Sequence, residues 1–83
     1  MKQIKLYTTA GCHLCEQAEL MLKHLIEHDV KIAEQFCWVS IDIANDESLV
    51  EQFGIRIPVL VKDMKEIGWP FEIFELREWL ICE

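Results

Sequence analysis

Several features are scarce in this 83-residue chain, and each scarcity excludes a class of protein. Cysteine occurs four times, well below the density of small secreted scaffolds that disulfides hold together. Eight basic residues stand against 15 acidic ones, which leaves a net charge of −7. Nucleic-acid-binding proteins carry basic patches, and anionic membranes repel acidic surfaces. No apolar run approaches the roughly 20 residues of a transmembrane helix. We therefore expect neither nucleic acid nor a membrane as a partner.

The N-terminus also lacks the pattern of a secretory signal, because Met1–Lys5 alternates in polarity instead of leading into a long apolar run. Neither an internal repeat nor a linker-like stretch interrupts the sequence. Apolar residues make up 52% of the chain, which is enough for one hydrophobic core but not for two. We expect residues 1–83 to form the single domain of a monomeric cytoplasmic protein.

What is present is an ordered series of hydrophobic patterns. Alternation of apolar and polar residues predicts a strand over residues 3–8, with Ile4 and Leu6 on one face. A helical face follows directly, formed by Leu14, Ala18, Met21, Leu22, Leu25 and Ile26. Segment 29–35 is polar and is predicted to be a connection, although the helix could extend into it. The aromatic and β-branched run 36–43 predicts a second strand that is well buried.

The second half of the chain predicts shorter elements. Asn45–Asp46 can cap a helix, and Gly54 is expected to end it in a left-handed conformation. Segments 59–61 and 66–68 predict two strands joined by a tight turn, and a last helix follows Trp69–Pro70. The fold class is therefore α/β with the order β-α-β-α-β-β-α. A right-handed parallel crossover and an antiparallel hairpin predict a mixed four-stranded sheet with helices on both faces.

Two of the four cysteines form a pair, Cys12-His13-Leu14-Cys15, where the first strand gives way to the first helix. Cysteines three residues apart in a first helical turn can close a small disulfide ring. Cys12 would lie at the helix N-terminus, where unpaired N–H groups and the positive dipole end favour a thiolate. Such a position lowers the pKa of a thiol from about 8.5 into the range of roughly 3.5 to 7.5. Cys12 is therefore predicted to attack a disulfide, and the more shielded Cys15 to resolve the mixed disulfide.

Residues near this pair are candidates for assisting it. A protonated His13 would add positive charge beside Cys12, although an exposed histidine with no role explains the sequence equally well. If the Ile57–Pro58 bond were cis, the free N–H and C=O of Ile57 could pair with an extended substrate. The local sequence favours trans, since only about 5–6% of X-Pro bonds are cis. Arg56 could meet an anionic substrate or the thiolate, or could be a solvated cation.

Two stretches carry a resemblance to a known family. The run 7–18, Tyr-Thr-Thr-Ala-Gly-Cys-His-Leu-Cys-Glu-Gln-Ala, resembles the active-site opening of the glutaredoxin-like branch of the thioredoxin superfamily. Asp42–Ile43, Leu49 and residues 53–60 resemble the second half of that family. The resemblance covers nearly the whole chain with the right spacing.

The resemblance implies a thioredoxin fold with a cis Pro58 beside the cysteine pair, Cys12 as nucleophile and Cys15 as resolving thiol. It implies a thiol–disulfide oxidoreductase that needs no cofactor. Its partners would be a disulfide-containing protein or a low-molecular-weight thiol, with a reductase or glutathione as electron donor. Glutathione is a possible ligand with an incomplete motif, since Gly68–Phe71 replaces the family's Gly-Gly followed by Ser/Thr-Asp. Trp69 could line the groove in which glutaredoxins bind glutathione.

The remaining candidates are assigned structural roles. His24 and His28 lie one helical turn apart without a third ligand nearby, so a solvated face is favoured and no metal site is predicted. Cys37 is expected to be an inert buried thiol, and Cys82 is a minor candidate for an intermolecular disulfide. The three tryptophans are expected to pack in the core or at its rim.

Two other functions stay open. Cys12, together with Cys15 or a second protomer, could bind a metal ion or an iron–sulfur cluster. Alternatively, the chain could be a redox-inactive binding module with a thioredoxin fold. Metal analysis of protein purified without oxygen tests the first alternative, and trapping of partners by a Cys15→Ser variant tests the second.

Overall fold

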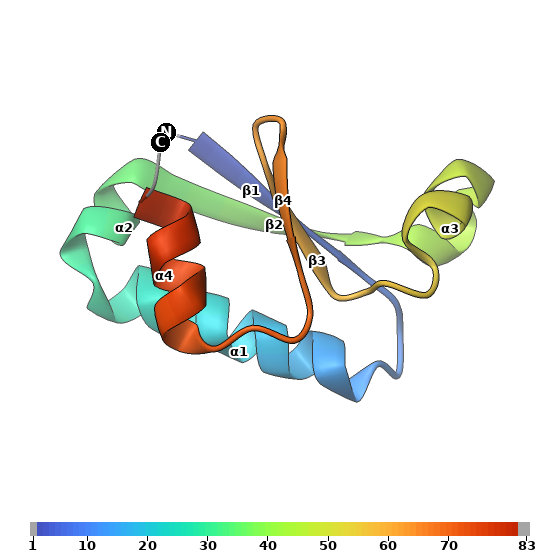
Figure 1. The fold of residues 1–83 in the computed structure, drawn as a ribbon, viewed down its shortest axis with the longest axis horizontal. Coiled ribbons are helices and arrows are strands. Elements are labelled where there is room, and N and C mark those ends of the chain that lie inside the picture. Colours follow the sequence, from blue (N-terminus) through green and yellow to red (C-terminus); the bar gives the residue numbers. More distant parts are fainter. Residues whose placement is uncertain (1, 82–83) are drawn as a thin grey trace.

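The structure is a computed structural model that describes residues 2–81. Its strands are β1 (Lys2–Thr8), β2 (Phe36–Asp42), β3 (Val59–Lys62) and β4 (Lys65–Gly68). They form one sheet in the order β2-β1-β3-β4, in which β2 is parallel to β1 while β3 and β4 are antiparallel to their neighbours (Figure 1). The predicted mixed sheet, with its parallel crossover and its hairpin, is therefore confirmed.

Helices connect and cover these strands. They are α1 (His13–His28), α2 (Val30–Gln35), the 3₁₀ turn η1 (Ile43–Asn45), α3 (Glu47–Phe53) and α4 (Ile73–Ile81). No helix within residues 2–81 combines the length and the hydropathy that crossing a bilayer requires. The last helix begins three residues after Trp69–Pro70, later than the sequence pattern indicated.

The segment after α1 is a separate helix and not a loop. Asp29 has an extended backbone, and its N–H donates to the Leu25 carbonyl oxygen to end α1. The same residue then begins α2, because its Oδ1 accepts the backbone N–H groups of Lys31 and Ile32. A single aspartate thus ends one helix and caps the next.

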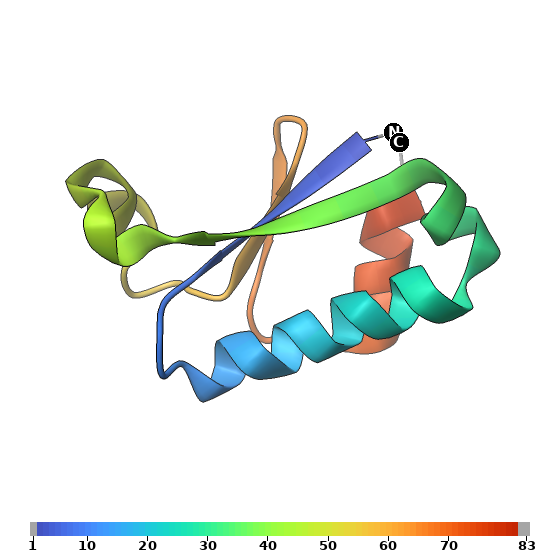
Figure 2. The same cartoon turned by 180° about the vertical axis from the view of Figure 1, so that it is seen from behind.

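Two hydrophobic clusters lie on opposite faces of the sheet. The larger one joins Ile4 and Leu6 of β1 to α1, α2 and α4. The smaller one joins Val59 of β3 to Phe53 of α3 and Ile43 of η1, with Tyr7 stacked on Phe53 at 4.4 Å between ring centroids. Figures 1 and 2 show α1 and α4 on one side of the sheet, with α3 at one end. The helices therefore lie on both faces, as predicted.

Strand β2 is more exposed than its sequence indicated. It is an edge strand, and within it only Phe36 is buried. Cys37 is exposed, so the prediction of an inert buried thiol was wrong. The register places Cys37 opposite Gln3 and Val39 opposite Lys5, on the face that α3 covers only in part. An apolar sequence therefore does not bury this strand, since burial depends on which helix covers its face.

Gly54 also departs from expectation. Its backbone is right-handed, with φ −49° and ψ −38°, so the predicted left-handed helix stop was wrong. Its N–H donates to the Val50 carbonyl oxygen at 2.8 Å and continues the helical pattern. A Cβ atom at this position would collide with that same carbonyl oxygen. The glycine is therefore required by a close approach of the backbone and not by its own dihedral angles.

We expect Gly54→Ala to destabilise the fold by roughly 1–3 kcal/mol, because a methyl group must displace the Val50 carbonyl. Helix propensity alone predicts the opposite sign, since alanine is about 1 kcal/mol better than glycine in a helix. Urea unfolding measures the difference. Gly68→Ala is the matched control, because no atom lies within 4 Å of a Cβ built there. A Gly54→Ala variant that is more stable than the wild type would contradict the expected collision with the Val50 carbonyl oxygen.

An ion pair joins the end of α1 to α4. Arg77 Nε donates to Asp29 Oδ2 at 2.7 Å. The hydrogen bond from Arg77 holds the pKa of Asp29 below its ordinary value, and the backbone N–H groups of Ile32 and Lys31 act in the same direction. A carboxyl group whose pKa is lower in the folded state binds protons more weakly there than in the unfolded chain. Its contribution to stability is therefore present above the unfolded pKa of about 3.9 and is lost as pH falls through the folded pKa.

Asp29→Asn is expected to reduce stability at pH 7 and to approach wild-type stability below pH 4. Asparagine keeps the helix cap but lacks the charge that Arg77 and the N-terminus of α2 stabilise. Urea unfolding of both proteins at a series of pH values gives the difference. The control is Glu34→Gln, which removes a carboxylate from an exposed position on α2 and should cost less stability at pH 7 than Asp29→Asn. A wild-type advantage that grows as the pH falls would contradict the assignment.

Candidate redox site

A tight turn places Cys12 at the start of α1. β1 ends at Thr8, and Gly11 follows in the left-handed region with φ +77°. Only glycine adopts this conformation without strain, so the turn explains Gly11 immediately before the cysteine pair. Cys12 itself has an extended backbone and is the N-cap of α1. The predicted position of Cys12 at the helix N-terminus is confirmed.

The sulfur of Cys12 occupies the place of a capping oxygen. Cys12 Sγ accepts a hydrogen bond from the backbone N–H of Cys15 at 3.2 Å, and the Cys12 carbonyl oxygen accepts from Glu16 N–H at 3.1 Å. The N–H groups of a first helical turn point outward and carry partial positive charge. The donor that Cys15 supplies would therefore stabilise a negative charge on Cys12 Sγ in the reduced protein.

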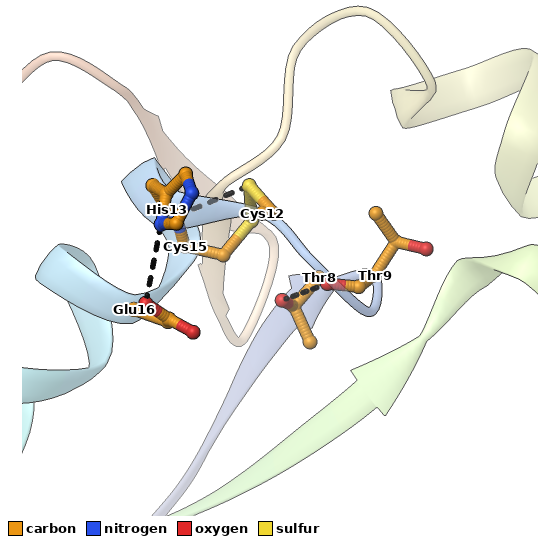
Figure 3. The surroundings of a disulfide bond; sticks show 6 residues. All are labelled: Thr8, Thr9, Cys12, His13, Cys15 and Glu16. Carbon is orange, nitrogen blue, oxygen red and sulfur yellow. Dashed lines mark hydrogen bonds and ion pairs between the residues drawn. A yellow bond between two sulfur atoms is a disulfide. The ribbon is translucent and has the colours of Figure 1, made fainter.

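A disulfide joins Cys12 to Cys15, whose Cα atoms are 5.2 Å apart (Figure 3). Cys12 is half-buried, whereas only 2% of Cys15 is exposed. The expected asymmetry between an accessible first thiol and a shielded second thiol is confirmed. A nucleophile from another molecule can reach the sulfur of Cys12 far more easily than that of Cys15.

The two residues between the cysteines both face solvent. His13 Nδ1 lies 3.6 Å from Glu16 Oε2, and 91% of the His13 side chain is exposed. Leu14 is 45% exposed, although the helical pattern placed it on the apolar face. Since α1 has only just begun there, the core contacts of this face start at Cys15 and Ala18. The tuning role of His13 stays a prediction, and Glu16 is a nearby carboxylate that the spacing i, i+3 could have indicated.

The loop before β3 contains the second group of predicted residues. The Ile57–Pro58 peptide bond is cis, as the family resemblance implied and in contrast to the preference of the local sequence. The N–H of Ile57 is not free, because it donates to the Phe53 carbonyl oxygen at 3.1 Å. The expectation of a free N–H was therefore wrong. Within residues 2–81 no hydrogen bond reaches the Ile57 carbonyl oxygen, so only this half of the expected backbone pairing is open.

Arg56 ties this loop to its surroundings. Its Nε and Nη2 donate to the Gln52 carbonyl oxygen at 3.2 and 3.0 Å, and Nη1 donates to Glu66 Oε1 at 2.7 Å. The guanidinium also lies 5.1 Å from the centroid of the Phe53 ring. Arg56 thus connects the end of α3 to β4. Sequence reasoning missed Glu66, because only the pairing of β3 with β4 brings it close.

Trp69 directly follows β4, at the same end of the β3–β4 hairpin as Pro58. Its N–H donates to the Pro58 carbonyl oxygen at 3.1 Å, and its ring meets Phe71 edge-on at 5.1 Å between centroids. The Trp69–Pro70 bond is also cis. All three tryptophans pack against the larger core cluster, which confirms their expected structural role. A contact of Trp69 with substrate stays a prediction.

Two further predictions concern residues outside this site. The rings of His24 and His28 meet edge-on at 4.5 Å between centroids. Within residues 2–81 no group of three or more His, Cys, Asp and Glu side chains is placed to hold a metal ion. Cys82 lies outside the described residues.

Comparison with known proteins agrees with this geometry. Residues 3–81 match the family model described as Glutaredoxin-like domain (DUF836). The chain is similar to the X-ray structure of the structural-genomics target protein XcR50 from X. campestris, with 36% identity, a TM-score of 0.76 and 93% of each chain covered. The solution structure of XcR50 is also similar, at 36% identity and a TM-score of 0.74, over 96% of this chain and 92% of that chain. No curated protein matches.

The family match begins one residue inside β1 and ends with α4, and the X-ray structure of XcR50 is 36% identical over 93% of this chain. The architecture is accordingly the thioredoxin-like fold, with the cysteine pair at the start of its first helix. The chain belongs to the family of glutaredoxin-like domains.

Proposed function

We propose that this protein is a thiol–disulfide oxidoreductase that uses the Cys12–Cys15 couple to reduce disulfides in proteins or small molecules. The observation that carries the proposal is the placement of Cys12 Sγ as the cap of α1. There it accepts the Cys15 N–H and lies next to a disulfide partner that is nearly inaccessible. A half-exposed sulfur at a helix N-terminus favours the thiolate, which is the reactive form of cysteine.

The first step begins from the dithiol form of the protein. The Cys12 thiolate attacks one sulfur of the substrate disulfide, a bond forms between Cys12 and that sulfur, and the substrate bond breaks. The leaving substrate thiolate takes a proton from solvent. The Cys15 N–H and the N-terminus of α1 stabilise Cys12 before attack, which raises the thiolate population near neutral pH.

Cys15 completes the transfer. Its thiol loses a proton, its sulfur attacks Cys12, and the mixed disulfide breaks to release the second substrate thiolate. The substrate has then gained two electrons and two protons, and the protein holds the Cys12–Cys15 disulfide. The short distance between the two residues, with Cα atoms 5.2 Å apart, makes this attack intramolecular and fast. An external thiol, either glutathione or the dithiol of a reductase, returns the protein to the reduced form.

Charge and one backbone group indicate the class of substrate. A net charge of −7 favours neutral or basic disulfide partners over acidic ones. The Ile57 carbonyl oxygen, which receives no hydrogen bond within residues 2–81, is the backbone group best suited to an N–H of an extended substrate. Arg56 precedes Ile57 in the chain, and Trp69 N–H donates to the Pro58 carbonyl oxygen. Together with His13, which lies next to Cys12, these residues are the candidate substrate contacts. We place the reaction in the reducing environment of the cytoplasm.

Two measurements on the wild-type protein test the proposal. Reduction of insulin and of a glutathionylated peptide should proceed with dithiothreitol as donor. Alkylation of the reduced protein by iodoacetamide should give an apparent Cys12 pKa below about 8.5. Absence of turnover with both substrates, together with an ordinary Cys12 pKa, would overturn the proposal. Iron and zinc analysis of protein purified without oxygen would instead reveal a cluster or metal bound through Cys12.

A further inference from the structure

A groove separate from the disulfide lies between the last turns of α1 and the first turns of α4. Its volume is about 320 Å³, at the lower end of the range for small-molecule sites. Figure 1 shows α4 lying beside the C-terminal part of α1. His24, the lining residue nearest to the disulfide in sequence, is nine residues after Cys15, about 14 Å along the helix. A ligand of this groove would therefore not touch the cysteine pair.

Apolar side chains supply part of the lining of the groove. Leu25 is 6% exposed and Ile73 is half-buried, and both line the cavity. Phe74 also lines the groove and is 77% exposed. When a hydrocarbon group covers a large aromatic ring that faces solvent, apolar surface is removed from water and the free energy falls. The groove is thus suited to an aromatic or aliphatic body.

The other lining residues are mainly hydrogen-bond donors. Arg77 uses Nε for Asp29, and within residues 2–81 its two terminal nitrogens have no acceptor. The exposed imidazoles of His24 and His28 stand beside each other on α1, and each neutral imidazole has one N–H to donate. Asp29 is the one carboxylate of the lining, and it is already occupied by Arg77 and by two backbone N–H groups.

We propose that this groove binds a small amphipathic carboxylate, such as an aryl or short alkyl acid. The carboxylate would accept hydrogen bonds from the terminal nitrogens of Arg77 and from the imidazoles, and the hydrocarbon would cover Leu25, Ile73 and Phe74. Guanidinium groups match carboxylates in a planar, two-point geometry. The terminal nitrogens of Arg77 and the imidazole N–H groups are donors next to apolar lining residues, and this combination favours a ligand with a carboxylate at one end and a hydrocarbon at the other. The assignment is independent of the thiol chemistry.

Titration of the ¹⁵N-labelled protein with 3-phenylpropionate tests the proposal. We expect saturable shifts of the amides of residues 24–29 and 73–77, with a dissociation constant on the order of 1 mM. The neutral 3-phenylpropionamide and the cationic 3-phenylpropylamine should bind at least about tenfold more weakly. Shifts that do not saturate, that occur elsewhere, or that are equal for the acid and the amide would overturn the proposal.

Substitutions at exposed positions test the apolar residues and the hydrogen-bond donors of the groove separately, without disturbing the core. Phe74→Ser should weaken binding of 3-phenylpropionate, and His24→Ala combined with His28→Ala, which removes both imidazole donors, should reduce the preference for the acid over the amide, each by about tenfold. The matched controls are Leu20→Ser, another exposed apolar residue, and Lys23→Gln, neither of which lines the groove. Wild-type affinity and selectivity in the groove variants would overturn the assignment.

Discussion

Replacement of Cys12 by serine is expected to lower the rate of disulfide reduction by at least about a thousandfold, whereas replacement of Cys15 should trap the substrate covalently. A serine hydroxyl at the start of α1 is not ionised near neutral pH and cannot attack a disulfide. With Cys15→Ser, Cys12 still attacks, but no internal thiol releases the mixed disulfide. The two variants therefore fail at different steps. Turnover of insulin and the mass of the recovered protein distinguish them.

Cys37 provides the matched control for this prediction. It is an exposed cysteine outside the helix terminus, so Cys37→Ser should keep wild-type turnover and should not change the trapped adduct of Cys15→Ser. Comparison of Cys15→Ser with the double variant Cys12→Ser/Cys15→Ser then tests whether capture is covalent. If both variants captured partners equally, the protein would be a binding module and not a reductant.

Loss of the Lys62 ammonium is expected to cause the largest change in stability among polar substitutions. Only 4% of Lys62 is exposed. Its Nζ donates to the Trp79 and Leu80 carbonyl oxygens at 2.7 and 2.9 Å and lies 5.0 Å from the centroid of the Trp79 ring. These carbonyl groups belong to the last turn of α4, where intrahelical donors are missing and the dipole is negative. Lys62 thus attaches the end of α4 to the centre of the sheet.

Lys62→Met keeps most of the side-chain volume and removes the charge. Two carbonyl groups then lose a charged donor, while the cost of burying an ammonium group also disappears. We expect the first effect to prevail and the free energy of unfolding to fall by about 2 kcal/mol. Urea unfolding gives this value from the shift of the midpoint urea concentration, when the slope of the free energy of unfolding against urea concentration is the same in both proteins.

Lys65 is the matched control, because it pairs with Lys62 across the β3–β4 hairpin and is exposed. Lys65→Met should change the free energy of unfolding by less than about 0.5 kcal/mol. Equal stability of Lys62→Met and wild type would mean that burial of the charge costs as much as its hydrogen bonds contribute.

Local patterns were sufficient for most of the fold. The alternation at Ile4 and Leu6, the helical spacing of Ala18, Leu22 and Leu25, and the cap at Asp46 each depend on neighbours within a few residues. The position of Cys12 at the start of a helix was also predictable from neighbouring residues, because the turn before it and the helical face after it are both short-range patterns. The cis state of Pro58 came from the family resemblance, since the residues around it favour trans.

Local patterns failed where a distant segment decided the outcome. The run 36–43 is apolar enough for a central strand, but the sheet order makes it an edge, and Cys37 is exposed as a result. The place of Gly54 after a helix predicts a left-handed conformation, whereas its backbone stays right-handed and its N–H still donates to the Val50 carbonyl oxygen. The Ile57 N–H was expected to be free, but the turn after α3 supplies the Phe53 carbonyl oxygen as its acceptor.

The sequence by itself determined most of the strands and helices and which two cysteines are paired, because hydrophobic period, turn chemistry and i, i+3 spacing operate over short stretches. The tertiary structure alone decided the partners of the charged residues. Lys62 meets α4 across 17 and 18 residues, Arg77 meets Asp29 across 48, and Arg56 meets Glu66 through the pairing of two strands. A buried or paired charge is stabilised by groups that only the packed chain brings within hydrogen-bond distance.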